Sequence, residues 1–202
     1  MSRDTLRAAT QFFGGRICLD FANTLDWRTS DAPQELLPDY PALLTWSRNR
    51  GTLSAAAVTA LRAQSDGPEA VAILAAARAL RTEIWQIADA LMQGAPVPLA
   101  PLNLRLAALP AQPRLIADGT RHLHDLPGMR PEETLWPVLW SLTALLASED
   151  AQRLGCCQAD GCGWYFVDES PNRTRVWCSS EGCGNRERAR RAYAKRRVPV
   201  VS

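Results

Sequence analysis

The sequence predicts a mainly α-helical chain that ends in a small module built from a β-hairpin and a helix. The helical part is indicated by apolar residues that recur three to four positions apart, most clearly between Pro68 and Gly94, which mark the ends of one long helix. The C-terminal module is indicated by two pairs of cysteines that bracket a strand-turn-strand pattern and precede a run of strong helix formers.

Length and composition place the chain among ordinary globular proteins. It has 202 residues, of which 47% are hydrophobic and 22% charged, so it can bury a sizeable core. The N-terminus has no uninterrupted apolar run followed by a small-residue cleavage site, so we expect no secretory signal and a cytoplasmic protein. The longest apolar stretch, 135–147, contains Pro137 and is shorter than the roughly 20 residues that cross a bilayer. We therefore expect no membrane span.

Capping residues and helix breakers divide the first three quarters of the chain into several helices. Asp39 and Ser54 are expected N-caps, and Gly51 is an expected helix end. An Asp-Gly pair between two short apolar runs predicts one small β-hairpin over 115–124. The stretch 17–25 fits either a buried helix or a strand. The expected helices are 41–48, 54–64, 68–93, 102–109 and 131–154.

Four of the six cysteines form two matched pairs, Cys157-x4-Cys162 and Cys178-x4-Cys183, with 15 residues between the pairs. Zinc prefers thiolate ligands, and four of them close its tetrahedral shell and leave no position for water. The spacing therefore predicts one structural Zn²⁺ ion without hydrolytic chemistry. Disulfides and plain buried thiols are the alternatives, and a reducing cytoplasm disfavours the disulfides.

The other two cysteines lie outside this pattern. Cys156 is directly beside Cys157 and is an alternative ligand, although it would lengthen the first spacer from four residues to five. Cys18 and Cys156 are better explained as small apolar side chains that fill space in the core.

The residues between and after the cysteine pairs complete the predicted module. We expect a strand at 164–167, a turn at 168–172 and a returning strand at 175–177, so that this hairpin closes the metal site. The sequence after Cys183 favours a helix, whose positive N-terminal end stabilises thiolate. The combination predicts a treble-clef-like zinc module.

Charge is distributed unevenly along the chain. Residues 152–202 contain ten Arg or Lys against five Asp or Glu, a net charge of +5, so the remainder must carry −3 to give the total of +2. This asymmetry predicts a helical domain over 1–151 and a basic zinc module over 152–202. Such a density of arginine is typical of phosphate binding, while a solvated tail, or arginines paired with the protein's own acids, is the alternative. The expected phosphate contacts are Arg173, Arg175, Arg186, Arg188, Arg190, Arg191, Lys195, Arg196 and Arg197.

Two segments also carry a family resemblance. The C-terminal segment, with FVDES, RVWCS and the run Cys-Gly-Asn-Arg at 183–186, resembles the CGNR zinc finger of bacterial proteins. The N-terminal LDFANTL is similar to the LDxxNT opening of the ABATE domain, which precedes that finger in a family described as stress-induced transcriptional regulators. Together the two resemblances cover nearly the whole chain. They imply a mostly helical N-terminal domain, nucleic-acid binding, and four zinc ligands, Cys157, Cys162, Cys178 and Cys183.

Several polar and aromatic residues have both a functional and a structural interpretation. Asp20 and Asn23 would line a small-molecule effector pocket, or would cap a helix or form a buried hydrogen-bond network, which we favour. Asn185 would read a base, or would brace the zinc loop, which is again the favoured interpretation. Trp164 and Trp177 flank the metal ligands and would stack on a base or pack in the core.

These observations favour a nucleic-acid-binding regulator of transcription, whose basic C-terminal helix contacts phosphates of DNA or RNA. The alternative is a protein-interaction module with a structural zinc site, whose arginines meet an acidic partner. We expect no enzyme, because the sequence has no nucleophile with a base, no Gly-rich phosphate loop and no open metal site. A homodimer and an effector of the helical domain remain compatible with the sequence.

Overall fold

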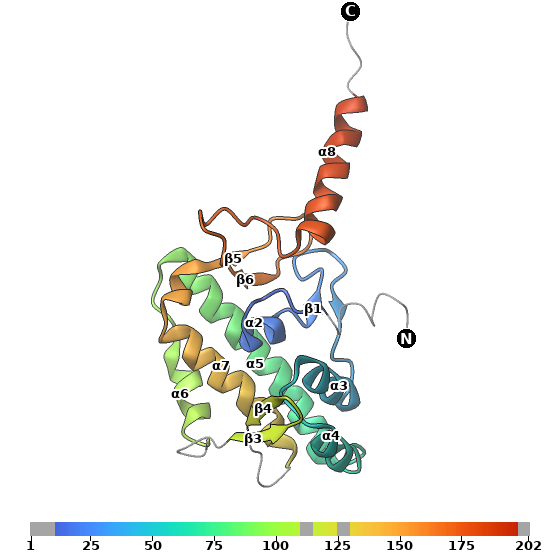
Figure 1. Cartoon of the computed structure of the whole chain (residues 1–202), viewed down its shortest axis with the longest axis vertical. Coiled ribbons are helices and arrows are strands. Elements are labelled where there is room, and N and C mark those ends of the chain that lie inside the picture. The colour runs from blue at the N-terminus through green and yellow to red at the C-terminus, as the bar shows by residue number, and fades with distance from the viewer. Residues whose placement is uncertain (1–10, 110–114, 125–129, 198–202) are drawn as a thin grey trace, which may run out of the picture.

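The computed structural model describes residues 11–109, 115–124 and 130–197. This part of the chain forms a body of packed helices from which one helix, α8, projects (Figure 1). Three two-stranded antiparallel sheets accompany the helices. The mainly α-helical class, with a C-terminal hairpin-and-helix module, is therefore confirmed. The α-helices in the described part are α2 (Ile17–Ala22), α3 (Tyr40–Arg50), α4 (Ala55–Arg62), α5 (Pro68–Gln93), α6 (Leu99–Leu106), α7 (Trp136–Leu146) and α8 (Asn185–Arg197).

Helix α5 is the long central helix that the sequence predicts. It begins at Pro68, where the missing N–H costs no helical bond, and it is followed by Gly94, whose φ of 64° is the left-handed conformation that ends many helices. The face of α5 that includes Ala77, Leu80 and Ile84 is completely buried. The helices α2, α3 and α6 pack against this helix.

The predicted caps of α3 and α4 are confirmed. The Asp39 carboxylate accepts a hydrogen bond from the N–H of Ala42 at 2.7 Å, and the Ser54 hydroxyl accepts one from the N–H of Ala57 at 3.1 Å. Gly51 ends α3 with a φ of 76°. Each of these local signals satisfies a backbone group that has no partner within the helix.

Helix α2 resolves the ambiguity of the LDFANTL stretch in favour of a helix. It packs against α5, α7 and the C-terminal strand β6 (Tyr165–Val167). Cys18, Leu19, Phe21 and Ala22 are all inaccessible to solvent. A helix this short buries apolar residues on nearly every side because it lies in the middle of the fold (Figure 1).

The helix predicted over 131–154 is shorter than expected. The chain instead forms a 3₁₀ turn η1 (Pro131–Leu135), then α7, and a second 3₁₀ turn η2 (Glu149–Arg153). Pro137 is tolerated because it lies in the first turn of α7. After α7 the Ser148 hydroxyl donates a hydrogen bond to the Leu145 carbonyl at 2.9 Å, which satisfies one of the free carbonyls at the helix end.

The predicted small hairpin in the first part of the chain is confirmed. Strands β3 (Leu115–Asp118) and β4 (Arg121–His124) pair antiparallel around the Asp-Gly turn. A second pair, β1 (Leu25–Asp26) with β2 (Gln34–Glu35), was not predicted. These strands are only two residues long and have no alternating pattern. The loop that they enclose, residues 27–33, lies against the zinc module, as described below.

The hairpin of the C-terminal module differs from the expected one. Strand β6 lies where we predict a strand, but its partner is β5 (Leu154–Cys156), not a returning strand at 175–177. The segment after β6 folds back early because the Asp168 carboxylate accepts hydrogen bonds from the N–H groups of Ser170 and Arg175. The returning segment makes one backbone bond, from Gln158 to Val176 at 3.1 Å, and forms no strand.

The larger of two buried hydrophobic clusters contains residues of both the helical body and the zinc module. Tyr165 and Val167 of β6 belong to the same buried cluster as the residues of α2, α5 and α7. A smaller cluster surrounds the cysteines and includes Leu36 from the N-terminal part of the chain. Buried contacts therefore cross the predicted boundary between 151 and 152, which stays a prediction. No helix within the described ranges has the length and apolarity that a bilayer span requires.

The side chain of Asn23 joins α2 to β6. Its amide NH₂ donates to the Tyr165 carbonyl at 2.9 Å, and its amide oxygen accepts from the Tyr165 N–H at 2.8 Å. Asn23 is 4% exposed and Tyr165 is fully buried, so the amide replaces a missing strand neighbour for a backbone that water does not reach.

This pairing predicts a large cost for removing the amide. We expect Asn23→Ala to lower the free energy of unfolding by about 2–4 kcal/mol, because it leaves a buried N–H and a buried carbonyl without partners. Urea denaturation would measure the change. Asn103→Ala, on the exposed side of α6, is the matched control and should change stability by less than about 0.5 kcal/mol. Equal effects of the two substitutions would contradict the assigned role.

Candidate metal centre and nucleic-acid interface

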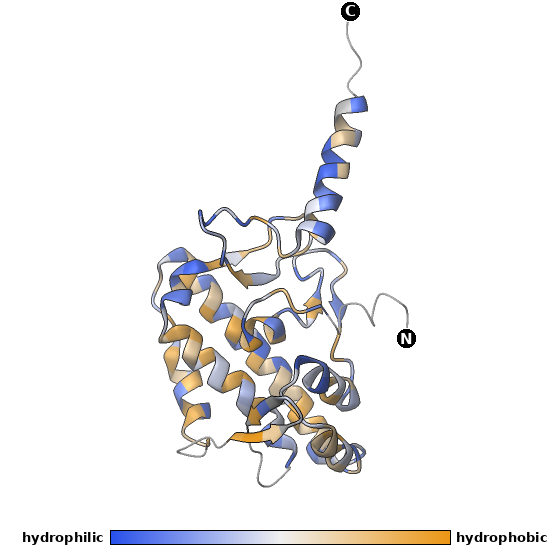
Figure 2. Cartoon of the chain, viewed as in Figure 1, coloured by the Kyte–Doolittle hydropathy of each residue, from blue (hydrophilic) through white to orange (hydrophobic). Residues whose placement is uncertain are grey.

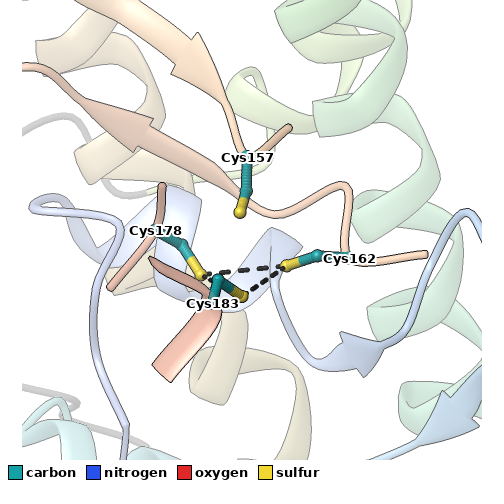
Figure 3. A group of neighbouring side chains, drawn as sticks. All are labelled: Cys157, Cys162, Cys178 and Cys183. Atoms are coloured by element: carbon teal, nitrogen blue, oxygen red, sulfur yellow. Dashed lines mark hydrogen bonds between the residues drawn. The ribbon is translucent and has the colours of Figure 1, made fainter. Parts of the chain in front are cut away.

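The structure brings together the four cysteines that the spacing predicts as ligands. Cys157 follows β5, Cys162 lies in the loop that leads to β6, Cys178 ends the returning segment, and Cys183 lies in the single turn η3 (Ser180–Gly184) before α8. Their sulfur atoms all lie within 4.8 Å of one another and point toward a common centre (Figure 3). All four residues are buried.

The distances between these sulfur atoms fit a tetrahedral zinc ion. Cys178 and Cys183 are 3.4 Å apart, Cys183 and Cys162 are 3.6 Å apart, and Cys162 and Cys178 are 3.8 Å apart. Four thiolates at about 2.3 Å from one zinc ion lie about 3.8 Å from each other. Because four soft, buried donors fill the shell, the group is compatible with one structural zinc ion.

The electrostatics of the cluster call for a cation. The pKa of Cys157 is lowered by hydrogen bonding from Cys162, whereas the pKa values of Cys162 and Cys178 are raised, first by their hydrogen bonds to Cys157. Ionisation of one thiol in this cluster therefore disfavours ionisation of the neighbouring thiols, since like charges repel at such short range. A divalent ion allows all four sulfurs to be thiolates.

Cys156 and Cys18 lie outside the cluster. The sulfur of Cys156 is 3.9 Å from the Arg28 guanidinium and 4.0 Å from the Cys157 carbonyl, and it is not part of the four-sulfur group. Cys18 lies in the helical core, where burial raises its pKa to about 12. Both positions are compatible with the expectation that these thiols fill space.

The loop over Gly161 and Gly163 makes a close contact with the N-terminal part of the chain. Both glycines have positive φ values, 74° and 65°. A Cβ atom at Gly163 would lie 2.5 Å from the Thr29 side chain. The N–H groups of Arg28 and Thr29 donate to the carbonyls of Cys162 and Gly161, both at 3.2 Å. The first cysteine pair is therefore held by residues that precede it by more than 130 positions.

The residues of the Cys-Gly-Asn-Arg run each have a structural role in the second half of the site. Gly184 allows close packing, because a Cβ atom there would lie 3.0 Å from Trp177. Asn185 accepts a hydrogen bond from Arg188 at 2.6 Å, which agrees with the expectation that it braces this loop. Arg186 donates to the Cys183 sulfur at 3.2 Å.

Four of the predicted phosphate contacts have partners within the protein, and one of them is Arg188, which donates to Asn185 and to the Ser180 carbonyl. The guanidinium carbon of Arg175 lies 4.2 Å from the centroid of the Phe166 ring. The same side chain donates hydrogen bonds to four carbonyls, those of Phe13, Val167, Trp177 and Cys178. Arg175 therefore acts as a structural residue. Arg186 faces the metal cluster, as just described. Arg190 pairs with Asp160 at 3.1 Å and Glu187 at 2.9 Å. For Arg190 the alternative of pairing with the protein's own acids is the one that the structure shows.

The other predicted contacts remain at the surface. Arg173 is exposed at the tip of the loop after β6, with a φ of 51°. Arg191 and Arg196 are exposed on α8, and the Arg191 guanidinium carbon lies 5.9 Å from the Trp177 ring centroid. The backbones of Lys195 and Arg197 belong to α8, while their side chains lie outside the described part of the structure.

Asp20 forms an internal contact, like Asn23. Its carboxylate accepts from the Gly14 N–H at 2.8 Å and from Arg50 at 2.7 Å, and burial raises its pKa. These contacts support the buried network over the effector pocket. Trp164 is also internal, since it is 4% exposed and donates its indole N–H to the Leu25 carbonyl at 3.2 Å.

Sequence reasoning missed the residues that support the metal site from outside the module. Leu36 packs beside the cysteines. The centroid of the Trp27 ring lies 4.2 Å from the guanidinium carbon of Arg186. Glu187 is also unexpected, because its side chain is 4% exposed and accepts from the Asp160 N–H at 3.4 Å. An acid within a basic run was the one local signal of such a contact.

A helical body that holds a four-cysteine module with a basic helix defines the chain as a zinc-finger protein. Two family models match it: ABATE, described as "Putative stress-induced transcription regulator", over residues 15–149, and the CGNR zinc finger over residues 153–196. Because the first match spans more than half of the chain, the protein belongs to the ABATE family, here with a C-terminal CGNR zinc finger. No curated protein matches the chain.

The donor set predicts the metal content of the purified protein. We expect one zinc ion per chain by elemental analysis, and loss of that zinc in a Cys178→Ala Cys183→Ala double variant, because two thiolates do not retain structural zinc. Cys156→Ala should keep the full zinc content. Zinc loss in the Cys156 variant, or full zinc in the double variant, would show that the ligand set is different.

Proposed function

We propose that this protein regulates transcription by binding nucleic acid through the exposed part of α8, while the zinc site holds that helix in place. The observation that carries the proposal is the composition of the helix after Glu187. Residues 188–197 contain six Arg or Lys and no acid, and the described side chains from 188 to 196 are all exposed. A polyanion is the partner that such a surface fits.

The way α8 is anchored supports this proposal. Glu187 is buried against the loop of the first cysteine pair, and beyond it the helix extends away from the body (Figure 1). Hydrophilic residues predominate on the projecting part, with a few less polar ones between them, whereas the most hydrophobic residues gather in the body (Figure 2). Like charges three and four positions apart weaken an isolated helix, and bound phosphates would remove that repulsion.

Among nucleic acids, the helix fits duplex DNA best. An α-helix with its side chains is about 10–12 Å wide, which matches the B-DNA major groove of about 12 Å. The residues from 188 to 197 span about 15 Å, enough to cross that groove. The major groove of A-form RNA is too narrow for side chains to read. Basic residues on several sides of α8 would reach the phosphates of both strands.

The assignment to transcription rests on the family description and on the zinc finger. We assign the protein a binding function, not a catalytic one, and place it in the cytoplasm, where reduced thiols remain available for zinc. The helical body would then carry the signal, through an effector or a second copy of the chain. The alternative partner is an acidic protein surface, and the carboxylates that Arg190 already contacts are a small-scale example of such binding.

The salt dependence of binding tests this proposal. We expect the affinity for duplex DNA to fall steeply as the salt concentration rises. Arg191→Ala and Arg196→Ala should each flatten the slope of log affinity against log salt by about one unit. The reason is that binding with one phosphate contact fewer releases about one counterion fewer. Arg62→Ala, an exposed arginine on α4 at the opposite end of the body, is the control and should leave the slope unchanged.

The same titration with single-stranded DNA and double-stranded RNA distinguishes the outcomes. Equal or tighter binding to double-stranded RNA would contradict insertion into the major groove while preserving nucleic-acid binding. No binding to any of the three near about 50 mM salt, together with an acidic protein partner that depends on the same arginines, would contradict the whole proposal.

A further inference from the structure

We propose that Arg186 is a positioning residue of the zinc site, and that Trp27 of the helical body holds it against the Cys183 sulfur, so that the retention of zinc depends on the helical body. The proposal rests on the four-cysteine zinc site and is independent of nucleic-acid binding. It changes the role of Arg186, which the sequence groups with the phosphate contacts.

The contact between Arg186 and Cys183 favours the thiolate form of this ligand. The guanidinium donates an N–H to the Cys183 sulfur at 3.2 Å, within the range of a hydrogen bond to sulfur. Four thiolates around one Zn²⁺ ion leave a net charge of about −2, so a cation at this distance lowers the energy of the loaded site. Outer hydrogen bonds of this kind also fix the direction of the ligand.

Trp27 determines where the guanidinium lies. The guanidinium carbon is 4.2 Å from the centroid of the Trp27 ring, which is the geometry of a cation–π interaction. Trp27 has a φ of 52°, a conformation that a bulky residue adopts only when its surroundings impose it. Its N–H donates to the Asp26 carboxylate at 2.9 Å, which holds the start of the loop.

The same loop holds the other half of the zinc site. Directly after Trp27, the N–H groups of Arg28 and Thr29 donate to the backbone of Gly161 and Cys162. Residues 27–29 therefore contact the first cysteine pair through the backbone and the second pair through the stacked Arg186. A loop that fixes the two pairs relative to each other reduces the reorganisation that zinc binding requires.

Zinc affinity of the full chain tests this inference. We expect Arg186→Gln to weaken zinc binding about 10–100-fold, measured by competition with a chelator of known affinity, because outer-shell partners contribute that much to metal sites. Trp27→Ala should weaken it in the same direction, because the Trp27 ring positions the guanidinium of Arg186. The two substitutions together should weaken zinc binding less than the product of the separate effects, because they break one chain of contacts.

Matched variants separate this role from charge and from folding. Arg196→Gln removes one charge from the exposed part of the same helix and should retain the wild-type zinc affinity. Arg186→Lys keeps the charge but loses the planar stack on Trp27. Trp27→Phe keeps an aromatic ring, so it should retain most of the zinc affinity that Trp27→Ala loses. The cobalt-substituted protein gives a second readout, since its sulfur-to-metal absorption band should shift in Arg186→Gln and in Trp27→Ala but not in Arg196→Gln.

Two results would overturn the inference. One is an Arg186→Gln protein that binds zinc as tightly as Arg196→Gln. The other is a Trp27→Phe protein that loses as much zinc affinity as Arg186→Gln while it keeps the wild-type helical circular dichroism. If Trp27→Ala does not fold, the Arg186 series and Trp27→Phe still decide the question.

Discussion

The paired hydrogen bonds between the Asn23 amide and the backbone of Tyr165 are the constraint on which the other parts depend. They attach β6 to α2 at the centre of the fold, where water is excluded. Once β6 is fixed, its partner β5 delivers Cys157, and the loop between the strands delivers Cys162. The metal site is thus joined to the helical body by buried contacts. Asn23, directly after the last residue of α2, therefore has a structural role.

The arginines of the C-terminal part divide into two groups with different tasks. Arg175 and Arg186 make contacts within the zinc module, where Arg175 donates to carbonyls and Arg186 donates to a ligand sulfur. Arg191 and Arg196 face solvent on a helix that no other element covers along its outer turns (Figure 1). One residue type thus builds the module and supplies the charge of its surface. Net charge by itself overstates the number of arginines available to a phosphate backbone.

Local signals in the sequence were sufficient for much of the fold, because caps, glycines and cysteine spacing act over a few residues. The caps at Asp39 and Ser54 and the ends of α5 are of this kind. The partner of β6 was predicted wrongly, since the choice depends on how Asp168 turns the chain and on which strand reaches the core. The inward direction of Arg175 and the contact of Trp27 with Arg186 join positions that are 150 or more residues apart. No local pattern encodes such contacts.

The central claim is that the zinc site and the helical body form one cooperative unit. It is tested most directly by urea unfolding of the zinc-loaded protein, with zinc release followed by a metal-sensitive dye and helix content by circular dichroism in the same samples. A shared core and a shared loop predict that the two transitions coincide, with the same midpoint and slope. Zinc release in a separate transition at lower urea, with the helix signal unchanged, would contradict the account.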